Sequence, residues 1–329
     1  MAHLLLTGAG FSRNWGGWLA SEALEYLLGC PEISGNQYLR GLLWKYSSSG
    51  GFEDALTAAQ QDYTRDPRTH TNDLPAFNDA LGRMFADMNE GYVARASFEF
   101  QSYKTQTVGE FLSRFNVIFS LNQDLLIEHY YMDCQTPASS GKWNGSSLPG
   151  MTPSPNPYVE NPNSWSQREW NPQPQADFKL DHRLQPYIKL HGSSNWRERH
   201  GGPMLIMGGN KKFDIGLSPV LMWYHEFFEK LLTQGDTRLM IIGYGFRDEH
   251  INKTLINAIS NHGLKVFIIS PQGADIAMPN KMSNRGLIRA RTELEVALEQ
   301  GLIGGSRRTM HEIFGGDPIE FNKVMRFFG

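Results

Sequence analysis

The sequence predicts an α/β fold with a doubly wound, mainly parallel sheet and a helical insertion. Two observations carry this prediction. Five short apolar runs, rich in Ile, Leu, Val or Phe, are too short for ordinary helices and end in Gly, Asn or Ser, as expected of strands buried on both faces. Helical patterns stand between several of these runs, as βαβ units require. We therefore expect a Rossmann-like alternation of strands and crossover helices.

The expected strands are distributed along most of the chain, at residues 3–8 (HLLLTG), 115–121 (FNVIFSL), 186–192 (PYIKLHG), 238–245 (RLMIIGYG) and 264–270 (LKVFIIS). Helices are expected after the first and fourth of them, at residues 17–28 and 248–260. A long helical insertion is expected at about residues 30–112, where apolar residues recur at three- and four-residue spacing, most clearly in 51–61 and 74–94.

Two further segments differ in character from this core. Residues of about 134–178 are rich in Pro, Ser, Asn and Gly, which predicts a loop outside the core. This loop is either a mobile surface excursion or a lid or partner contact anchored by Trp143, Trp165 and Trp170. We expect a single catalytic domain over residues 1–271, followed by a helical C-terminal extension over 272–329 with a helix at 289–302.

The composition narrows the class of protein. Of the 329 residues, 40% are hydrophobic and 20% charged, which is typical of a globular protein with a sizeable core. The net charge of -3 gives no electrostatic footprint for nucleic acid or an anionic membrane. The only cysteines, Cys30 and Cys134, form no C-x-x-C pair, so neither a four-cysteine zinc module nor a disulfide framework is expected. With no basic leader and no apolar run near the roughly 20 residues of a membrane span, a soluble cytoplasmic protein is expected.

The first expected strand runs into the stretch GAGFS. Gly8 and Gly10 permit a tight turn and a close backbone approach to a ligand, and free amides at the following helix start suit a pyrophosphate. Arg13 occupies the third glycine position of the G-x-G-x-x-G fingerprint of dinucleotide-binding proteins. A tight strand-to-helix turn without a ligand is therefore the alternative.

Polar residues follow the second and third strands. Asn122 and Asp124 project to the same side if the strand continues; an Asn can position a water, and an Asp can accept hydrogen bonds from sugar hydroxyls. His191 suits proton transfer near neutral pH, and Gly192 leaves room beside its imidazole for a ligand. The structural alternatives are a capping or turn role for the pair and a packed, hydrogen-bonded role for the histidine.

The fourth and fifth expected strands are also followed by candidate ligand-binding residues. Gly243 and Gly245 form a glycine turn before a helix for which Asp248 is a suitable N-cap, so this turn is a second candidate for phosphate binding. Ser270, in the stretch FIISP, is a candidate contact for an adenosine ribose or adenine.

Taken in order, G-A-G-x-S, S-L-N-Q-D, K-L-H-G, G-Y-G-F and I-I-S-P resemble the motifs of the sirtuin (silent information regulator) family, particularly its bacterial sirtuin-like branch, over about residues 3–271. Sirtuins arrange a GAG-x-S loop, a T-Q-N-x-D strand end and a catalytic L-H-G around NAD. The resemblance implies that Asn122 and His191 are catalytic, with His191 as the general base. It implies that NAD is held by Gly8, Ala9, Gly10, Ser12, Asp124, Gly243, Tyr244 and Ser270.

Departures from the sirtuin pattern refine this expectation. Protein-deacylating sirtuins carry two C-x-x-C pairs after the histidine motif, and residues 193–213 contain no cysteine. Ser120 and Leu121 replace the usual Thr-Gln, and Tyr244 replaces a polar residue. The chain is thus similar to sirtuin-like effectors of bacterial antiphage systems, which hydrolyse NAD to nicotinamide and ADP-ribose in abortive infection. A protein deacylase and a non-catalytic nucleotide-sensing or assembly subunit are the alternatives.

The same resemblance implies a substrate, partner proteins and a means of restraining the enzymatic activity. NAD is expected as the substrate, and no metal is expected. An effector that destroys NAD needs control in resting cells, so we expect homo-oligomerisation, a partner defence protein such as an ATPase or nucleic-acid sensor, or both. Direct binding to nucleic acid or a membrane is not expected from the charge and hydropathy of the chain.

Overall fold

A parallel sheet forms the centre of the protein. The computed structural model describes residues 1–329 except 96–97, 102–106, 156–160, 162 and 279–289. Its seven-stranded sheet pairs every neighbouring strand in parallel. In spatial order the strands are β11 (Leu302–Ser306), β10 (Lys265–Ile269), β9 (Thr237–Ile242), β1 (Ala2–Thr7), β2 (Val117–Ser120), β6 (Gln185–Lys189) and β3 (Ser146–Ser147). The predicted doubly wound α/β fold is confirmed.

The strand order contains a switch point beside β1. From β1 the chain adds β2 and β6 on one side, then returns to the other side of β1 to add β9 and β10. All of these strands run in the same direction, so their carboxyl ends share one edge of the sheet. Ligands of open α/β sheets bind at such a switch point, outside the carboxyl ends. The fold therefore places the ends of β1, β2, β6 and β9 around a candidate site.

The crossover helix predicted at residues 248–260 forms as expected. The helix α12 (Glu249–His262) connects β9 to β10, and Gly263 ends it in the left-handed region at φ 72°. The other helices outside the helical insertion, with short 3-10 or π helices labelled η, are α1 (Ala9–Ser12), η1 (Arg13–Trp15), α8 (Val108–Ser113), η2 (Glu128–Met132), α9 (Thr136–Ser139), η3 (Gln175–Asp177), α10 (Lys211–Leu217), α11 (Pro219–Leu232), η4 (Gly273–Ala277), α13 (Glu293–Gly301), α14 (Met310–Phe314), α15 (Pro318–Met325) and η5 (Arg326–Phe328).

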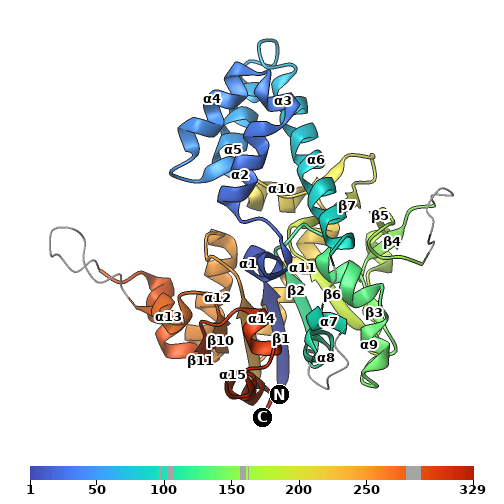
Figure 1. The fold of residues 1–329 in the computed structure, drawn as a ribbon, viewed down its shortest axis with the longest axis vertical. Coiled ribbons are helices and arrows are strands. Elements are labelled where there is room, and N and C mark those ends of the chain that lie inside the picture. Colours follow the sequence, from blue (N-terminus) through green and yellow to red (C-terminus); the bar gives the residue numbers. More distant parts are fainter. Residues whose placement is uncertain (96–97, 102–106, 156–160, 162, 279–289) are drawn as a thin grey trace.

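The helical insertion forms a lobe above the carboxyl edge of the sheet (Figure 1). Its longest helix, α6, buries residues at three- and four-residue spacing, including Phe77, Leu81, Met84 and Met88. The lobe consists of α2 (Ala20–Gly29), α3 (Pro31–Ser34), α4 (Gln37–Tyr46), α5 (Gly51–Arg65) and α6 (Asp73–Val93), and α7 (Phe98–Gln101) follows it. The lobe begins before the expected residue 30. The helix expected at residues 17–28 as a crossover belongs to the lobe instead, because α2 packs against α5 and α6.

The segment 134–178 is less irregular than expected. A second sheet has the order β4 (Met151–Pro153), β5 (Trp170–Pro172), β7 (Gly192–Arg197) and β8 (Pro203–Leu205). Trp170 is buried, and its ring stacks on Trp165 with centroids 4.9 Å apart. The expectation of a loop outside the core is therefore wrong for these residues, since the pairing of β5 with β4 and β7 draws Trp170 inward.

The C-terminal extension also differs from the expectation. Residues 302–306, expected to lie in or after a helix, form the edge strand β11, which pairs with β10. The run LIGGS combines two glycines with few apolar residues and so carries no clear strand pattern. Gly304 and Gly305 pack closely against Phe267 and the Ile268 carbonyl of β10, which explains why small residues occur there. The remainder of the described extension is helical.

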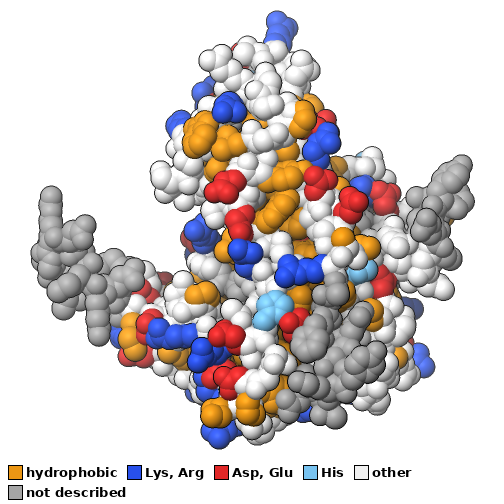
Figure 2. Space-filling view, in the orientation of Figure 1, with side chains coloured by type: hydrophobic (Ala, Val, Ile, Leu, Met, Phe, Trp, Pro, Cys, Tyr) orange, Lys and Arg blue, Asp and Glu red, His pale blue; other side chains and the backbone are white. Residues whose placement is uncertain are grey.

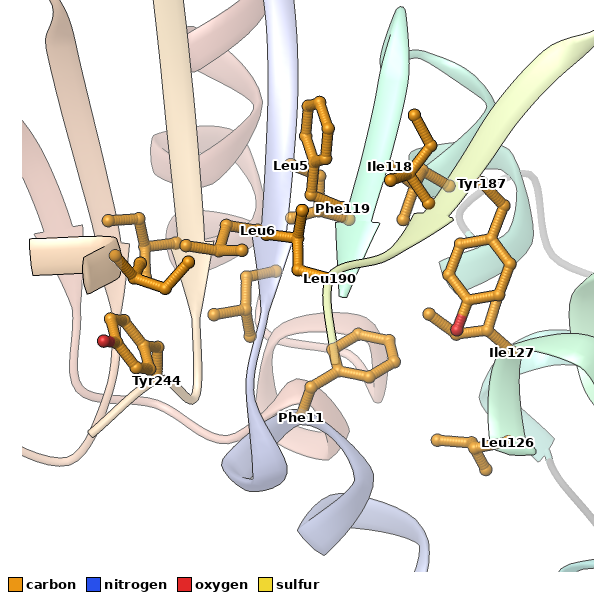
Figure 3. Close-up of a cluster of buried hydrophobic side chains, with 14 of the residues drawn as sticks. Leu5, Leu6, Phe11, Ile118, Phe119, Leu126, Ile127, Tyr187, Leu190 and Tyr244 are labelled. Carbon is orange, nitrogen blue, oxygen red and sulfur yellow. The ribbon is translucent and has the colours of Figure 1, made fainter. Parts of the chain in front are cut away.

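Buried side chains from β1, β2, β6 and the segments that follow these strands pack together in the core (Figure 3). Leu5, Leu6, Phe119 and Leu190 are fully buried. On the face in Figure 2, acidic and basic side chains are interspersed rather than gathered into one basic surface. None of the described helices is both long and apolar enough to cross a membrane.

Candidate active site

Two glycine turns meet at the switch point. A Cβ on Gly8 would lie 2.7 Å from the Tyr244 Cα, so only glycine permits the turns after β1 and β9 to approach this closely. The Gly8 amide donates to the Ile242 carbonyl at 2.9 Å, and the Gly10 amide donates to the Gly243 carbonyl at 2.9 Å. These two amides are therefore engaged by the neighbouring turn, and the expectation that they are free for a pyrophosphate is wrong.

Asn122 is held at the end of β2 from two directions. Its amide nitrogen Nδ2 donates to the Ser12 Oγ at 2.9 Å, and its backbone N–H donates to the Ser120 Oγ at 3.1 Å. Both partners are buried. Among the described residues no hydrogen bond engages the Asn122 side-chain oxygen, and Asn122 lines the cleft described below. That oxygen can accept a hydrogen bond from a ligand or water.

Asp124 lies beside Asn122 in a buried, charged environment. Its Oδ1 accepts from the Leu126 amide at 3.1 Å, and burial raises the pKa of its carboxyl group. Beneath it, the buried Lys189 Nζ donates to the Asp124 carbonyl at 2.6 Å and pairs with the Glu128 carboxylate at 2.7 Å. Because a buried ammonium requires a partner, Lys189 links β6 to the segment that carries Asp124.

His191 lies in the turn between β6 and β7. Its carbonyl accepts hydrogen bonds from the Ile206 amide at 3.0 Å and from the Gln123 Nε2 at 3.1 Å. These bonds tie the backbone at His191 to the segment after β8 and to the segment after β2. Burial is the main reason that the pKa of His191 lies well below its usual value, with smaller contributions from nearby Lys211 and His250. The imidazole is therefore neutral at neutral pH and able to accept a proton.

Gly192 has a different role from the one expected. It has φ 74°, and a Cβ there would lie 2.0 Å from the Met204 carbonyl oxygen. It does not line the cleft that His191 lines. The glycine is required by the left-handed backbone and by the close pairing of β7 with β8, rather than by the passage of a ligand.

Three histidines gather where β6, α11 and α12 meet. The His191 and His250 Nε2 atoms are 3.1 Å apart, and the His191 and His225 rings lie 6.4 Å apart in a stacked arrangement. The His225 Nε2 lies 2.9 Å from the Leu190 carbonyl, to which it donates. Burial lowers the pKa of His225 to about 4 and also lowers that of His250. All three rings are thus neutral near pH 7.

A lysine connects this group to the helical lobe. The Lys211 Nζ, at the start of α10, lies 2.7 Å from the Glu53 carboxylate in α5 and 2.7 Å from the Asp248 carboxylate at the start of α12. Asp248 is the N-cap residue of α12, as predicted, but its side chain makes no capping bond and instead pairs with Lys211. The lobe and the sheet edge are therefore joined directly beside His191.

A single cleft of about 2150 Å³ brings the predicted residues together. This exceeds the roughly 300–1,000 Å³ of common ligand pockets because the cleft continues between the sheet edge and the lobe. Nine of the ten predicted site residues line it: Gly8, Ala9, Gly10, Asn122, Asp124, His191, Gly243, Tyr244 and Ser270. The tenth, Ser12, is buried behind Asn122 and does not line the cleft.

Two of these nine also support the fold of the site. The Tyr244 hydroxyl accepts from the Asp248 amide at 3.1 Å and donates to the Asn252 Oδ1 at 3.0 Å, which braces the first turn of α12. The Ser270 Oγ accepts from the Gly273 amide at 3.1 Å and so closes the turn after β10. Both residues therefore have a structural reason to be present in addition to their place on the cleft.

Several residues that shape the site were not found from the sequence. A signal existed for His250, because it occupies the first turn of a helix that follows a strand at the ligand-binding edge. His225 lies in the middle of α11, and Lys211 begins α10, so neither position carries a local signal. Asn89 in α6 donates to the Ser194 Oγ at 3.0 Å and accepts from the Leu125 amide at 2.9 Å. That link becomes apparent only when the lobe is placed on the sheet.

A comparison with known protein families identifies the family to which this site belongs. A family model of the SIR2-like domain matches residues 116–287, just over half of the 329 residues. The chain belongs to the SIR2-like family. The matched segment includes Asn122, His191 and Gly243, whereas the turn at Gly8 precedes it and joins the site through the pairing of β1 with β2 and β9. SIR2-like proteins are in general NAD-dependent enzymes. A search of curated proteins found no match.

Proposed function

We propose that this SIR2-like chain is an NAD hydrolase that cleaves NAD to nicotinamide and ADP-ribose. The observation that supports the proposal most is the convergence of Asn122, His191 and the two glycine turns on one cleft at the switch point. The two cysteines of the chain cannot supply the four thiolates of a deacylase zinc module, which favours water over acyl-lysine as the acceptor.

NAD would lie across the carboxyl edge of the sheet. The backbone of Gly8, Ala9, Gly10 and Gly243 presents little side-chain bulk to the cleft, which suits a pyrophosphate at close range. Ser270, farther along the edge at the end of β10, suits the adenosine half. The nicotinamide ribose would then lie between β2 and β6.

The chemistry requires a broken glycosidic bond and an activated water. As nicotinamide leaves, the ribose passes through an oxocarbenium-like transition state, and water attacks the carbon that bore nicotinamide. The free Asn122 side-chain oxygen would accept a hydrogen bond from this water, and the neutral His191 would take up the released proton from ribose or water. Asp124 would hold the ribose hydroxyls. The products are nicotinamide, ADP-ribose and a proton.

Nicotinamide release from NAD tests this proposal directly. We expect His191→Ala and Asn122→Ala each to lower kcat by about 10²–10⁴, the usual contribution of general acid-base catalysis, while NAD still binds. The exposed His182 is a matched control, and His182→Ala should retain full activity. Near-full hydrolysis by both site variants would contradict the assigned roles.

Two further assays separate the alternatives. An acetylated peptide supplied with NAD should remain acetylated, because nothing in the proposal provides an acyl-lysine site; NAD-dependent deacetylation would favour the protein deacylase. Binding of NAD without nicotinamide release in every assembly state would favour a non-catalytic sensing subunit. Mass spectrometry of the products would also reveal whether cyclic ADP-ribose accompanies ADP-ribose.

We propose in addition that the activity serves bacterial antiphage defence, on the basis of the motif resemblance alone. The purified chain is then expected to be weakly active until it assembles into an oligomer or meets a partner such as an ATPase or nucleic-acid sensor. NAD levels should be compared in phage-infected cells that express the wild type or His191→Ala, with and without the genomic neighbours. Full activity of a purified monomer would contradict this restraint.

A further inference from the structure

The proposed general base belongs to a group of metal-ligand atoms whose other two members, His250 and Asp248, have no role in the hydrolysis mechanism. One nitrogen each of His191 and His250 and one carboxylate oxygen of Asp248 lie within 4.8 Å of one another. His191 is buried, and the other two residues are half-buried at the wall of the cleft. Two imidazoles and one carboxylate with access to a cleft form a ligand set typical of divalent transition metals.

The separation of the two ring nitrogens suits a shared ion. The His191 and His250 Nε2 atoms are 3.1 Å apart. Two nitrogens bound to one tetrahedral zinc ion at the usual bond length of roughly 2.0–2.1 Å lie about 3.3 Å from each other. A small movement of the two side chains would therefore admit an ion in place of the proton that the two nitrogens now share.

The charge around these ligands also permits a cation. Lys211 is the nearest ammonium group, but it is shared between the carboxylates of Glu53 and Asp248. The positive charge of Lys211 is therefore offset by these two carboxylates. His225 does not compete as a ligand through its Nε2, because that atom is engaged by the Leu190 carbonyl.

A third imidazole lies beside the two histidine ligands. The centroid of the His225 ring lies 6.4 Å from that of His191 and 5.3 Å from that of His250, and the His225 side chain lines the same cleft.

We propose that His191, His250 and Asp248 bind a divalent transition metal ion of the zinc class, and that the bound ion inhibits NAD hydrolysis. Three protein ligands leave a fourth tetrahedral position open toward the cleft. An ion on the His191 Nε2 occupies a ring nitrogen of the proposed base and places a positive charge beside the ribose that becomes cationic in the transition state. The inhibitory consequence depends on the proposed hydrolase function, whereas metal binding itself does not.

Calorimetric titration of the purified, tag-free, chelator-treated chain with zinc chloride tests the binding. We expect the wild type to bind one equivalent, and His250→Ala and Asp248→Asn each to weaken the affinity at least tenfold. His262→Ala is the matched control, because His262 is exposed at the far end of the same helix, and its affinity should equal that of the wild type. Thermal melting of each variant establishes that it is folded.

The choice of ion provides a second comparison. Magnesium prefers oxygen ligands and octahedral geometry, so magnesium chloride should bind far more weakly than zinc at this site. Equal affinity for both ions would overturn the assignment of imidazole ligands. Undiminished zinc binding by both His250→Ala and Asp248→Asn, or no binding by the wild type, would overturn the site.

Nicotinamide release in the presence and absence of zinc tests the consequence. Wild-type and His262→Ala proteins should lose at least tenfold in rate at saturating zinc and recover when a chelator is added. Zinc that binds through His250 without slowing hydrolysis would overturn the inhibition. Binding through His250 in a chain that releases no nicotinamide under any condition would support the metal site while contradicting the proposed hydrolase function.

Discussion

At the scale of single residues, the chemistry of the site depends on burial. His191 is 3% exposed, and this burial, more than any neighbouring charge, holds the pKa of the imidazole well below its usual value. Asn122 is held by Ser12 and Ser120, so its amide is oriented before any ligand arrives. A residue poised in this way loses little entropy on binding, which is the advantage of a preorganised site.

The depressed pKa of His191 predicts the pH dependence of hydrolysis. The neutral imidazole is the active form, and a lowered pKa means that it becomes protonated only at pH values below the ordinary 6.5. With a chelator present, kcat/KM for NAD should therefore stay level through neutral pH and fall only in more acidic solution. A midpoint at or above the ordinary value would contradict this prediction.

A variant that removes the charge of Lys211 tests the second cause of the lowered pKa of His191, after burial. Lys211 is the largest of the neighbouring charges that lower the pKa of His191. Lys211→Gln should move the acidic midpoint upward, but not as far as the ordinary value, because burial remains.

At the scale of elements, the site depends on two turns packed against each other. Gly243 has φ 66°, and a Cβ there would meet the Phe11 amide nitrogen at 2.2 Å and the Gly10 carbonyl carbon at 2.3 Å. These neighbours are backbone atoms and cannot rotate away. The glycines after β1 and β9 therefore hold the two strand ends together, as well as leaving room for a ligand.

Substitution of Gly243 should accordingly destabilise the protein and disrupt the site. For Gly243→Ala we expect a loss of more than the roughly 1–2 kcal/mol of the left-handed backbone, because the steric clash adds to it, together with weaker NAD binding. Gly245→Ala is the control, since a Cβ at Gly245 would meet no other atom within 4 Å. Thermal or urea unfolding measures the stability, and equal stability of the two variants would contradict the packing argument.

At the scale of the whole molecule, the C-terminal segment closes the end of the sheet opposite the site. The two termini lie near each other in Figure 1, and the Arg238 guanidinium of β9 donates to the Phe327 carbonyl at 2.8 Å. The Phe327 ring packs near His3, Phe115 and Phe267, from three different strands or strand ends. The extension is therefore part of the structural core.

Truncation of Phe327 tests that integration. The side chain is 2% exposed, so Phe327→Ala should lower the free energy of unfolding by about 3–5 kcal/mol, the usual cost of a large buried cavity. Ile319→Ala, at a residue that is 81% exposed, should change it by less than about 0.5 kcal/mol. Similar unfolding curves for the two variants would show that the tail is dispensable.

Local sequence patterns were sufficient to predict the parallel sheet and most of the residues of the site. The five apolar runs predicted β1, β2, β6, β9 and β10, since strands buried on both faces leave a compositional trace. Because carboxyl ends of parallel strands share one edge, Asn122, His191 and Gly243 could be expected together before their positions were known. The resemblance to sirtuins added their roles.

Tertiary structure alone decided what depends on contacts between distant segments. The strand β11 has a glycine-rich sequence and forms because β10 offers a free edge, and Trp170 is buried because β5 is paired on both sides. The metal-ligand group of His191, His250 and Asp248, and the link from Lys211 to the lobe, join elements that are far apart in the chain. Burial and proximity across the sheet edge are properties of the folded chain, and no local pattern encodes them.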